Sequence, residues 1–187
     1  ASTIKAVHHV HAMRQVALGS IALTTDVPWF TVSSNIASPK DGCPSDLGAA
    51  VADLQVGLEA MMETSDNRWT QAMRVEFGEA NLNDTAQALG MTSTLLQHRI
   101  GCAGGADGAI SEPHQLTLVD IGKLYEGVAN GYLLTNANRD IFYSLMSNGL
   151  SGDLTTVIDQ EAAALGLSDS AISSFKAGVD TAAKAGK

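Results

Sequence analysis

The strongest constraint on the fold of this 187-residue chain is its repeated helical periodicity. Apolar residues recur every three or four positions in successive segments, and most of these segments end at a glycine or an asparagine–glycine pair. No segment alternates convincingly between apolar and polar residues, so we expect no regular strands. We predict helices over residues 3–18, 47–63, 68–77, 83–89, 117–130, 137–147, 153–165 and 168–175. The chain is therefore expected to be mainly α-helical.

Two long stretches between the expected helices carry most of the turn-forming residues. Residues 20–46 contain three prolines and several serines, so we expect a loop with a short extended piece at 21–23. Residues 91–116 are rich in glycine, and an irregular connection of this length is usually functional or tied by a disulfide. Cys43 and Cys102 lie beside glycines, one in each stretch. They form either one disulfide, as in an exported protein, or two unrelated thiols, and both alternatives stay open.

The length and charge of the chain exclude several classes of protein. A chain of 187 residues fits one domain, spanning 1–187, that is large enough to bury a core. The formal net charge is −9, and the 11 lysines and arginines are scattered, so phosphate contacts would be poorly supplied. The apolar runs are too short to cross a membrane. We therefore expect no nucleic-acid partner and no membrane span.

The first candidate site is the pair Ser2 and Lys5, three residues apart near the start of the first expected helix. That spacing places both side chains on one helix face, a single turn apart. A neutral amine beside a primary hydroxyl can take the hydroxyl proton and so create a nucleophile. A lysine in water is protonated at neutral pH, but burial or a nearby cation lowers its pKa and makes it a base. The alternative is an ordinary helix start, with Ser2 as the N-cap and Lys5 in solvent.

Three histidines follow on the same helix. His8 and His11 share a face, as two ligands of one metal ion would, but no known motif supplies a third ligand. We therefore predict no metal site and interpret these histidines as helix-surface residues or as hydrogen-bonded core residues. His9 lies on the same stripe as Ser2 and Lys5, which would allow it to line a cleft.

The second candidate site is Ser65-Asp66-Asn67, in a break between two expected helices. By itself this motif is typical of a helix N-cap, because these three residue types are the usual caps. Together, Ser-x-x-Lys and Ser-Asp-Asn resemble the penicillin-recognising serine hydrolases, which include class A β-lactamases and penicillin-binding D-alanyl-D-alanine peptidases. The separation of 65 − 2 = 63 residues is similar to the class A pattern, and so is the order of residues 90–94, a long loop and a helix after 116–118. The resemblance runs over most of the chain.

The resemblance implies a role for each residue of these two motifs. Ser2 would attack the carbonyl of a lactam or peptide and become acylated, with Lys5 as its base. Ser65 would pass a proton to the leaving nitrogen, and Asn67 would bond both Lys5 and a substrate carbonyl. The backbone N–H of Ser2, at a helix N-terminus, would stabilise the oxyanion. Asp66 is expected to cap the next helix and to shape the break.

The third motif of the family, Lys-Thr-Gly, is matched best by Lys184-Ala185-Gly186, with Lys176-Ala177-Gly178 as the other candidate. By resemblance, Lys184 and Gly186 belong to the substrate-binding residues, and Lys184 would attract a substrate carboxylate. Alanine replaces the threonine of the motif, which removes a hydroxyl donor for that carboxylate. The substrate preference therefore stays open.

A glutamate in the long loop of class A enzymes activates water for deacylation. Residues 94–100 contain no acid at the aligned place, and the nearest acidic candidate is Glu112, beside Pro113. The position of Glu112 far along the loop favours a solvated residue. Without such a base an acyl-enzyme would hydrolyse slowly, as in a penicillin-binding protein.

The resemblance also implies the fold. In this family the nucleophile helix follows strands of a sheet, and more strands follow Lys-Thr-Gly. We therefore expect these residues to be the helical lobe of an α/β fold like that of β-lactamases and D-alanyl-D-alanine peptidases. The strands of the antiparallel sheet are expected to lie largely outside this chain.

Three functions stay open at this point. The first is a serine hydrolase of the β-lactamase type, which needs no cofactor and acts on a β-lactam or a related amide or ester. The second is a D-alanyl-D-alanine peptidase-like protein or binding module, acylated by a β-lactam or a peptidoglycan-like peptide with slow turnover. The third is a non-catalytic helical domain in which both motifs are caps. By resemblance, the protein would be secreted or periplasmic.

Overall fold

The computed structural model describes residues 2–32, 46–97, 100, 114–146 and 151–177, with only the backbone described at 151–155. Within these ranges the chain is mainly α-helical, as predicted, and no described helix is long and apolar enough to cross a lipid bilayer. The elements are the 3₁₀ turn η1 (Ser2–Ile4), α1 (Lys5–Ala17), β1 (Asp26–Trp29), β2 (Ala50–Asp53), α2 (Leu54–Glu63), α3 (Asn67–Phe77), α4 (Glu79–Ala88), α5 (Leu118–Ala129), α6 (Asn136–Ser144), α7 (Ser151–Ala164) and α8 (Asp169–Ala177).

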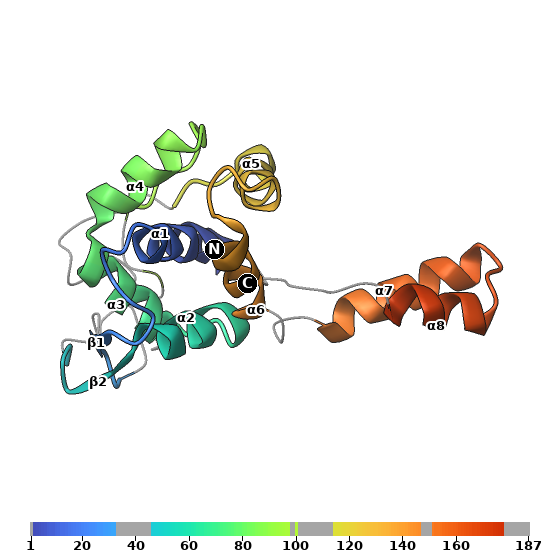
Figure 1. Cartoon of the computed structure of the whole chain (residues 1–187), viewed down its shortest axis with the longest axis horizontal. Helices are drawn as coiled ribbons and strands as arrows, with labels where there is room; N and C mark the ends of the chain where they lie inside the picture. Colours follow the sequence, from blue (N-terminus) through green and yellow to red (C-terminus); the bar gives the residue numbers. More distant parts are fainter. Residues whose placement is uncertain (1, 33–45, 98–99, 101–113, 147–150, 178–187) are drawn as a thin grey trace.

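Helix α1 lies at the centre of the core and contacts α2, α3, α4 and α6 (Figure 1). Every residue from Lys5 to Met13 is buried, including one lysine and three histidines. The apolar residues of this helix pack among buried side chains of its neighbours, such as Leu58, Met73 and Phe142. Because the Ser-x-x-Lys motif lies at the start of α1, the hydrophobic core and the candidate site share one helix.

The prediction of no strands is wrong, because β1 and β2 form an antiparallel pair. Their register aligns Asp26 with Asp53 and Trp29 with Ala50. Strands of four residues are too short to show the alternation that identifies a strand in a sequence. Helical apolar spacing already starts at residue 47 and continues through α2. The sequence therefore predicts a helix from residue 47, whereas α2 begins at Leu54.

Asp46 directly precedes the helix expected over 47–63, but α2 begins only at Leu54, so Asp46 does not cap it. Instead, the carboxylate of Asp46 binds the residues that follow β1. Its Oδ2 accepts hydrogen bonds from the backbone N–H groups of Thr31 (2.8 Å) and Val32 (3.0 Å), and from the Thr31 hydroxyl. These hydrogen bonds, that of the Thr31 side chain above all, hold the pKa of Asp46 below its usual range. Asp46 therefore ties the chain before β2 to the chain after β1.

Most of the other helix ends follow the sequence signals. Asp66 caps α3, with its carboxylate accepting from the backbone N–H of Arg68 at 2.9 Å. Thr117 caps α5, with its hydroxyl accepting from the backbone N–H of Asp120 at 3.1 Å. Helix α4 starts directly after Gly78 rather than at residue 83, and the remaining ends agree with the prediction to within about three residues.

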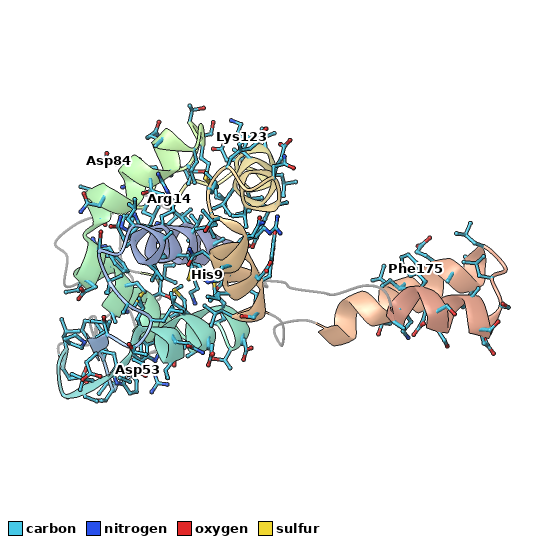
Figure 2. All side chains as sticks on the ribbon, viewed as in Figure 1. His9, Arg14, Asp53, Asp84, Lys123 and Phe175 are labelled. Carbon is cyan, nitrogen blue, oxygen red and sulfur yellow. The ribbon has the colours of Figure 1, made fainter. Side chains whose placement is uncertain are left out.

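Helices α7 and α8 pack on each other as a hairpin, which Figure 1 shows apart from the other helices. Lys176 donates to the carboxylate of Asp159 at 3.0 Å and links the two helices. Several large apolar side chains of the hairpin are exposed, among them Leu165 and Phe175, which is labelled in Figure 2. The prediction that all 187 residues form one domain stays a prediction.

The β-hairpin is joined to the helices by a pair of stacked indoles. Trp29 of β1 and Trp69 of α3 are nearly parallel, at 9°, with ring centroids 5.1 Å apart. Trp69 packs in turn against α2 at Gly57, where an added Cβ would lie only 2.3 Å from an atom of the indole ring. Only a glycine leaves room for this approach, so Gly57 fixes how closely α2 and α3 can pack.

The histidines of α1 lie in the core, and none of them lies on the helix surface. His9 is fully buried and stacks on Phe142, with ring centroids 4.1 Å apart, so it does not line a cleft. Within the described residues, neither ring nitrogen of His9 has a hydrogen-bond partner. Burial lowers the pKa of both His8 and His9 to about 3, so both are neutral at neutral pH.

We expect the substitution Gly57→Ala to lower the free energy of unfolding by about 1–3 kcal/mol, because the new methyl group overlaps the Trp69 ring. The control is Gly122→Ala in α5, where an added Cβ meets nothing within 4 Å. Alanine is the better helix former, so this control should stabilise the protein by up to about 1 kcal/mol. Urea denaturation measures both values. Equal effects of the two substitutions would contradict the close packing at Gly57.

Acid should destabilise the fold through the buried histidines. His8 and His9 titrate near pH 6.5 when unfolded but near pH 3 when folded, so protonation favours the unfolded chain. We expect the free energy of unfolding to fall below pH 6.5 by up to about 1.4 kcal/mol per pH unit for each histidine. The variant His9→Phe keeps an aromatic ring against Phe142 but has one titrating group fewer. The slope of the unfolding free energy against pH should therefore fall by up to about 1.4 kcal/mol per pH unit. Denaturation curves between pH 7 and 4 test this, and an unchanged slope in the variant would refute it.

Candidate active site

The turn between α2 and α3 holds Ser65 in an unusual backbone conformation. Its φ is 63°, and among the described residues it is the only non-glycine residue with a positive φ. This conformation costs a residue with a side chain about 1–2 kcal/mol and persists only where surrounding contacts impose it. The turn is therefore held in place against its own preference, as is common in functional sites.

Lys5 supplies the contacts that hold this turn. Its side chain is fully buried at the start of α1. Its Nζ donates to the Ser65 carbonyl oxygen at 2.6 Å, to the Ser65 hydroxyl at 3.1 Å and to Asn67 Oδ1 at 2.5 Å. One amine thus binds both ends of the Ser-Asp-Asn motif.

Ser2 completes the cluster. It lies in η1, directly before α1, and only 8% of its surface is exposed. The Ser65 hydroxyl donates to Ser2 Oγ at 2.9 Å, so Ser65 links Ser2 to Lys5. The structure therefore brings together all four residues that the two motifs singled out, although 63 residues separate Ser2 from Ser65. Ser65 and Asn67 are half-buried, so the cluster borders on solvent from their side.

Sequence reasoning missed Arg68, which clamps the turn from the other side. Its guanidinium binds the carboxylate of Asp66 with both Nε (3.0 and 3.1 Å) and Nη2 (2.6 Å). Its Nη1 donates to the Thr31 carbonyl oxygen at 3.3 Å, and its Cζ lies 5.1 Å from the centroid of the Trp29 ring. Asp66 is the cap that was predicted, but Arg68 connects that cap to the β-hairpin. No sequence motif marks an arginine at this position.

The segment before α5 is fixed by a buried carboxylate. Asp120 is 2% exposed and accepts hydrogen bonds from the Ser93 N–H (2.8 Å), the Thr94 hydroxyl (2.9 Å) and Lys123 (3.2 Å). Burial raises the pKa of Asp120, but these hydrogen bonds outweigh it and hold the pKa below its usual range. A two-way backbone bridge joins residues 95 and 115 nearby, with both N···O distances at 3.0 Å. The two ends of the long stretch between α4 and α5 thus meet.

The remaining predicted site residues lie outside the described residues. They are the substrate-binding candidates Lys184 and Gly186, the deacylation candidate Glu112, and the possible disulfide partners Cys43 and Cys102. Among the described residues, no group of three or more histidine, cysteine, aspartate or glutamate side chains is arranged to hold a metal ion. His8 and His11, which share a helix face, are both buried.

Similar solved structures have the same fold. A β-lactamase from Chitinophaga pinensis is 17% identical, with a TM-score of 0.63 over 81% of this chain and 56% of its own. A β-lactamase from Sphaerobacter thermophilus is 20% identical, with a TM-score of 0.62 over 79% and 54%. The protein PBP-A is 21% identical, with a TM-score of 0.62 over 80% and 54%, and a mutant of it was solved as an acyl-enzyme complex with penicillin G.

The chain thus spans just over half the length of these structures, and its described part is mainly helical, with one short pair of strands. Both facts agree with the predicted helical lobe of a β-lactamase-like fold, with most sheet strands outside this chain. No curated protein matches the chain. A family model for the β-lactamase enzyme family matches residues 1–175. The chain therefore belongs to the β-lactamase enzyme family.

Proposed function

We propose that this chain carries the acylating half of a serine hydrolase that opens a β-lactam, or a related amide or ester, through an acyl-serine intermediate. One observation supports this most: the Ser65 hydroxyl lies 2.9 Å from Ser2 Oγ and 3.1 Å from Lys5 Nζ. Ser65 therefore offers a short path for a proton between the nucleophile and the amine. If both motifs were only helix caps, nothing would require the buried lysine that contacts Ser65 and Asn67, neither of which caps α3.

Acylation would begin with attack of Ser2 Oγ on the carbonyl carbon. The Ser2 proton would pass through the Ser65 hydroxyl to the neutral amine of Lys5, while the carbonyl electron pair moves to oxygen. On collapse of the tetrahedral intermediate the C–N bond breaks, and the proton returns through Ser65 to the leaving nitrogen. Ser2 is left as an ester of the opened ring. Each transfer follows a contact that the cluster already contains, between Ser2 and Ser65 or between Ser65 and Lys5. With Lys5 neutral, both hydrogen bonds would reverse direction, because hydroxyl protons rotate freely.

The other groups would position the substrate and its developing charge. Ser2 begins η1, which leads into α1, so its backbone N–H would act as an N-terminal helix donor to the oxyanion. Asn67 binds Lys5 through Oδ1 and would bond a substrate carbonyl through its side-chain amide. Lys184, with Gly186, would bind a substrate carboxylate. A complete site would also need the sheet of the family fold.

Turnover separates the two enzymatic possibilities. If Glu112 or another base activates water, the ester is hydrolysed and the protein is a β-lactamase. If no base does so, the acyl-enzyme persists and the protein is a penicillin-binding protein, for which a peptidoglycan-like peptide would be the substrate. The acyl-enzyme complex of the PBP-A mutant with penicillin G supports the acylation step common to both. A secreted or periplasmic location would suit either.

The mass of the complete polypeptide after incubation with benzylpenicillin tests the proposal. We expect an adduct of one penicillin per chain in the wild type and none in Ser2→Ala, because the nucleophilic hydroxyl is gone. An adduct that clears with time indicates a β-lactamase, and one that persists indicates a penicillin-binding protein. The control is Ser20→Ala, which removes an exposed hydroxyl beyond the end of α1 and should still form the adduct. No adduct in the wild type would refute acylation.

Two substitutions at one position separate the chemistry of Ser65 from the strain of its backbone. Ser65→Gly and Ser65→Ala both remove the hydroxyl, but only glycine tolerates the φ of 63° without strain. We expect both to slow acylation by a similar factor, about 10²–10⁴, as for loss of a proton-transfer group. The glycine variant should be the more stable of the two by about 1 kcal/mol. A wild-type acylation rate in Ser65→Gly, measured by stopped-flow with a chromogenic cephalosporin, would exclude the proton path through Ser65.

A further inference from the structure

A cavity lies at the end of α1 remote from Ser2. It is formed by α1, α3, α4 and the turn that follows α1, and its volume is about 710 Å³, within the range of small-molecule sites. Arg14, which lines it, follows Lys5 by nine residues, or about 13 Å along the helix axis. The cavity shares no lining residue with the Ser2, Lys5, Ser65 and Asn67 cluster.

A buried histidine contributes to the wall of this cavity. His11 is only 5% exposed, and its Nδ1 is 2.7 Å from the hydroxyl of Thr85 on α4. Its ring packs edge-on against Phe77, with centroids 5.0 Å apart. Within the described part of the chain, Nε2 has no hydrogen-bond partner, yet it is not among the polar atoms sealed in the core. His11 lines the cavity, and Nε2 is the ring nitrogen that Thr85 leaves for a ligand there.

Charged groups of both signs surround the same space. Arg14 comes from α1, Glu76 from the last turn of α3 and Asp84 from α4 (Figure 2 labels Arg14 and Asp84). Among the described residues, none of these three side chains forms an ion pair or a hydrogen bond. Burial first, and then the charge of Arg14, lowers the pKa of His11, so the imidazole is neutral at neutral pH. The cavity thus presents one cation and two carboxylates that do not neutralise one another.

We propose that this cavity binds a small zwitterion, an α-amino acid or the like, with an apolar side chain. The carboxylate of the ligand would bind Arg14, with His11 Nε2 beside it. The ammonium group would lie between Glu76 and Asp84, and the side chain would pack on Phe77. A simple anion would meet two carboxylates and a simple cation would meet the guanidinium, so neither matches the cavity as well as a molecule that carries both charges.

Leucine, which carries both charges and a compact apolar side chain, is the probe. Its binding is followed by amide chemical shifts of α1, α3 and α4 in the whole chain, with the L and D forms tested separately. N-acetylleucine lacks the ammonium group, and leucinamide lacks the carboxylate. Each of these two half-ligands therefore keeps only one of the two charged groups that the cavity would bind. We expect saturable shifts with leucine and at least about tenfold weaker binding of both half-ligands. No saturable shift with either enantiomer, or equal binding of leucine and both half-ligands, would overturn the proposal.

Substitutions in the cavity locate the site. Arg14→Met keeps the length of the side chain without the charge, and Asp84→Asn keeps the shape of the carboxylate. Each should weaken leucine binding by at least about tenfold. The matched controls are Arg139→Met and Asp140→Asn on α6, neither of which lines the cavity, and both should bind leucine as the wild type does. Binding that survives both cavity substitutions would refute the site, and a spectrum of folded protein in each variant ensures that lost binding reflects the lost charge.

Discussion

The buried side chain of Lys5 is the interaction on which the rest of this structure depends. Its amine joins the start of the central helix to the turn between α2 and α3, through the carbonyl and hydroxyl of Ser65 and the amide of Asn67. A buried lysine without such partners would be strongly destabilising. The turn therefore supplies the oxygen atoms that Lys5 of α1 requires, and Lys5 in return holds the turn in its conformation. The same contacts place the Ser65 hydroxyl against Ser2. Stability and the proposed chemistry therefore rest on one cluster.

A strained turn in this position requires support from outside itself. Lys5 binds Ser65 from within the core, while Arg68 clamps Asp66 from the side of the β-hairpin. The guanidinium also reaches the Thr31 carbonyl and lies over Trp29, which stacks on Trp69. These contacts form a continuous path from α2 at Gly57 to the β-hairpin of β1 and β2. The short sheet has little stability of its own. These contacts hold it against the helices at the Ser-Asp-Asn turn, which carries the candidate catalytic residue Ser65.

The central helix carries an unusual load of polar side chains in the core. Lys5 finds oxygen partners and His11 finds Thr85, but the ring nitrogens of His9 have none among the described residues. An unsatisfied buried polar group costs about 1–3 kcal/mol, which the stacking on Phe142 offsets only in part. The two ends of this helix have different surroundings. One end meets the Ser-Asp-Asn turn, and the other opens on a cavity lined by charged side chains that have no ion-pair partner in the described part of the chain.

The sequence by itself determined the helices, most of their caps, the two motifs and the family, because local periodicity, cap residues and motif spacing are properties of neighbouring positions. It predicted that Ser2, Lys5, Ser65 and Asn67 act together, but only through the resemblance. The tertiary structure decided four further features. They are the contacts that unite these four residues, the Arg68 clamp, the burial of all three histidines and the pairing of β1 with β2. Each of these joins residues far apart in the chain, such as Arg68 and Thr31 or His9 and Phe142, so no local pattern encodes it. The physical reason is that helix periodicity specifies which face is buried, whereas packing decides what that face meets.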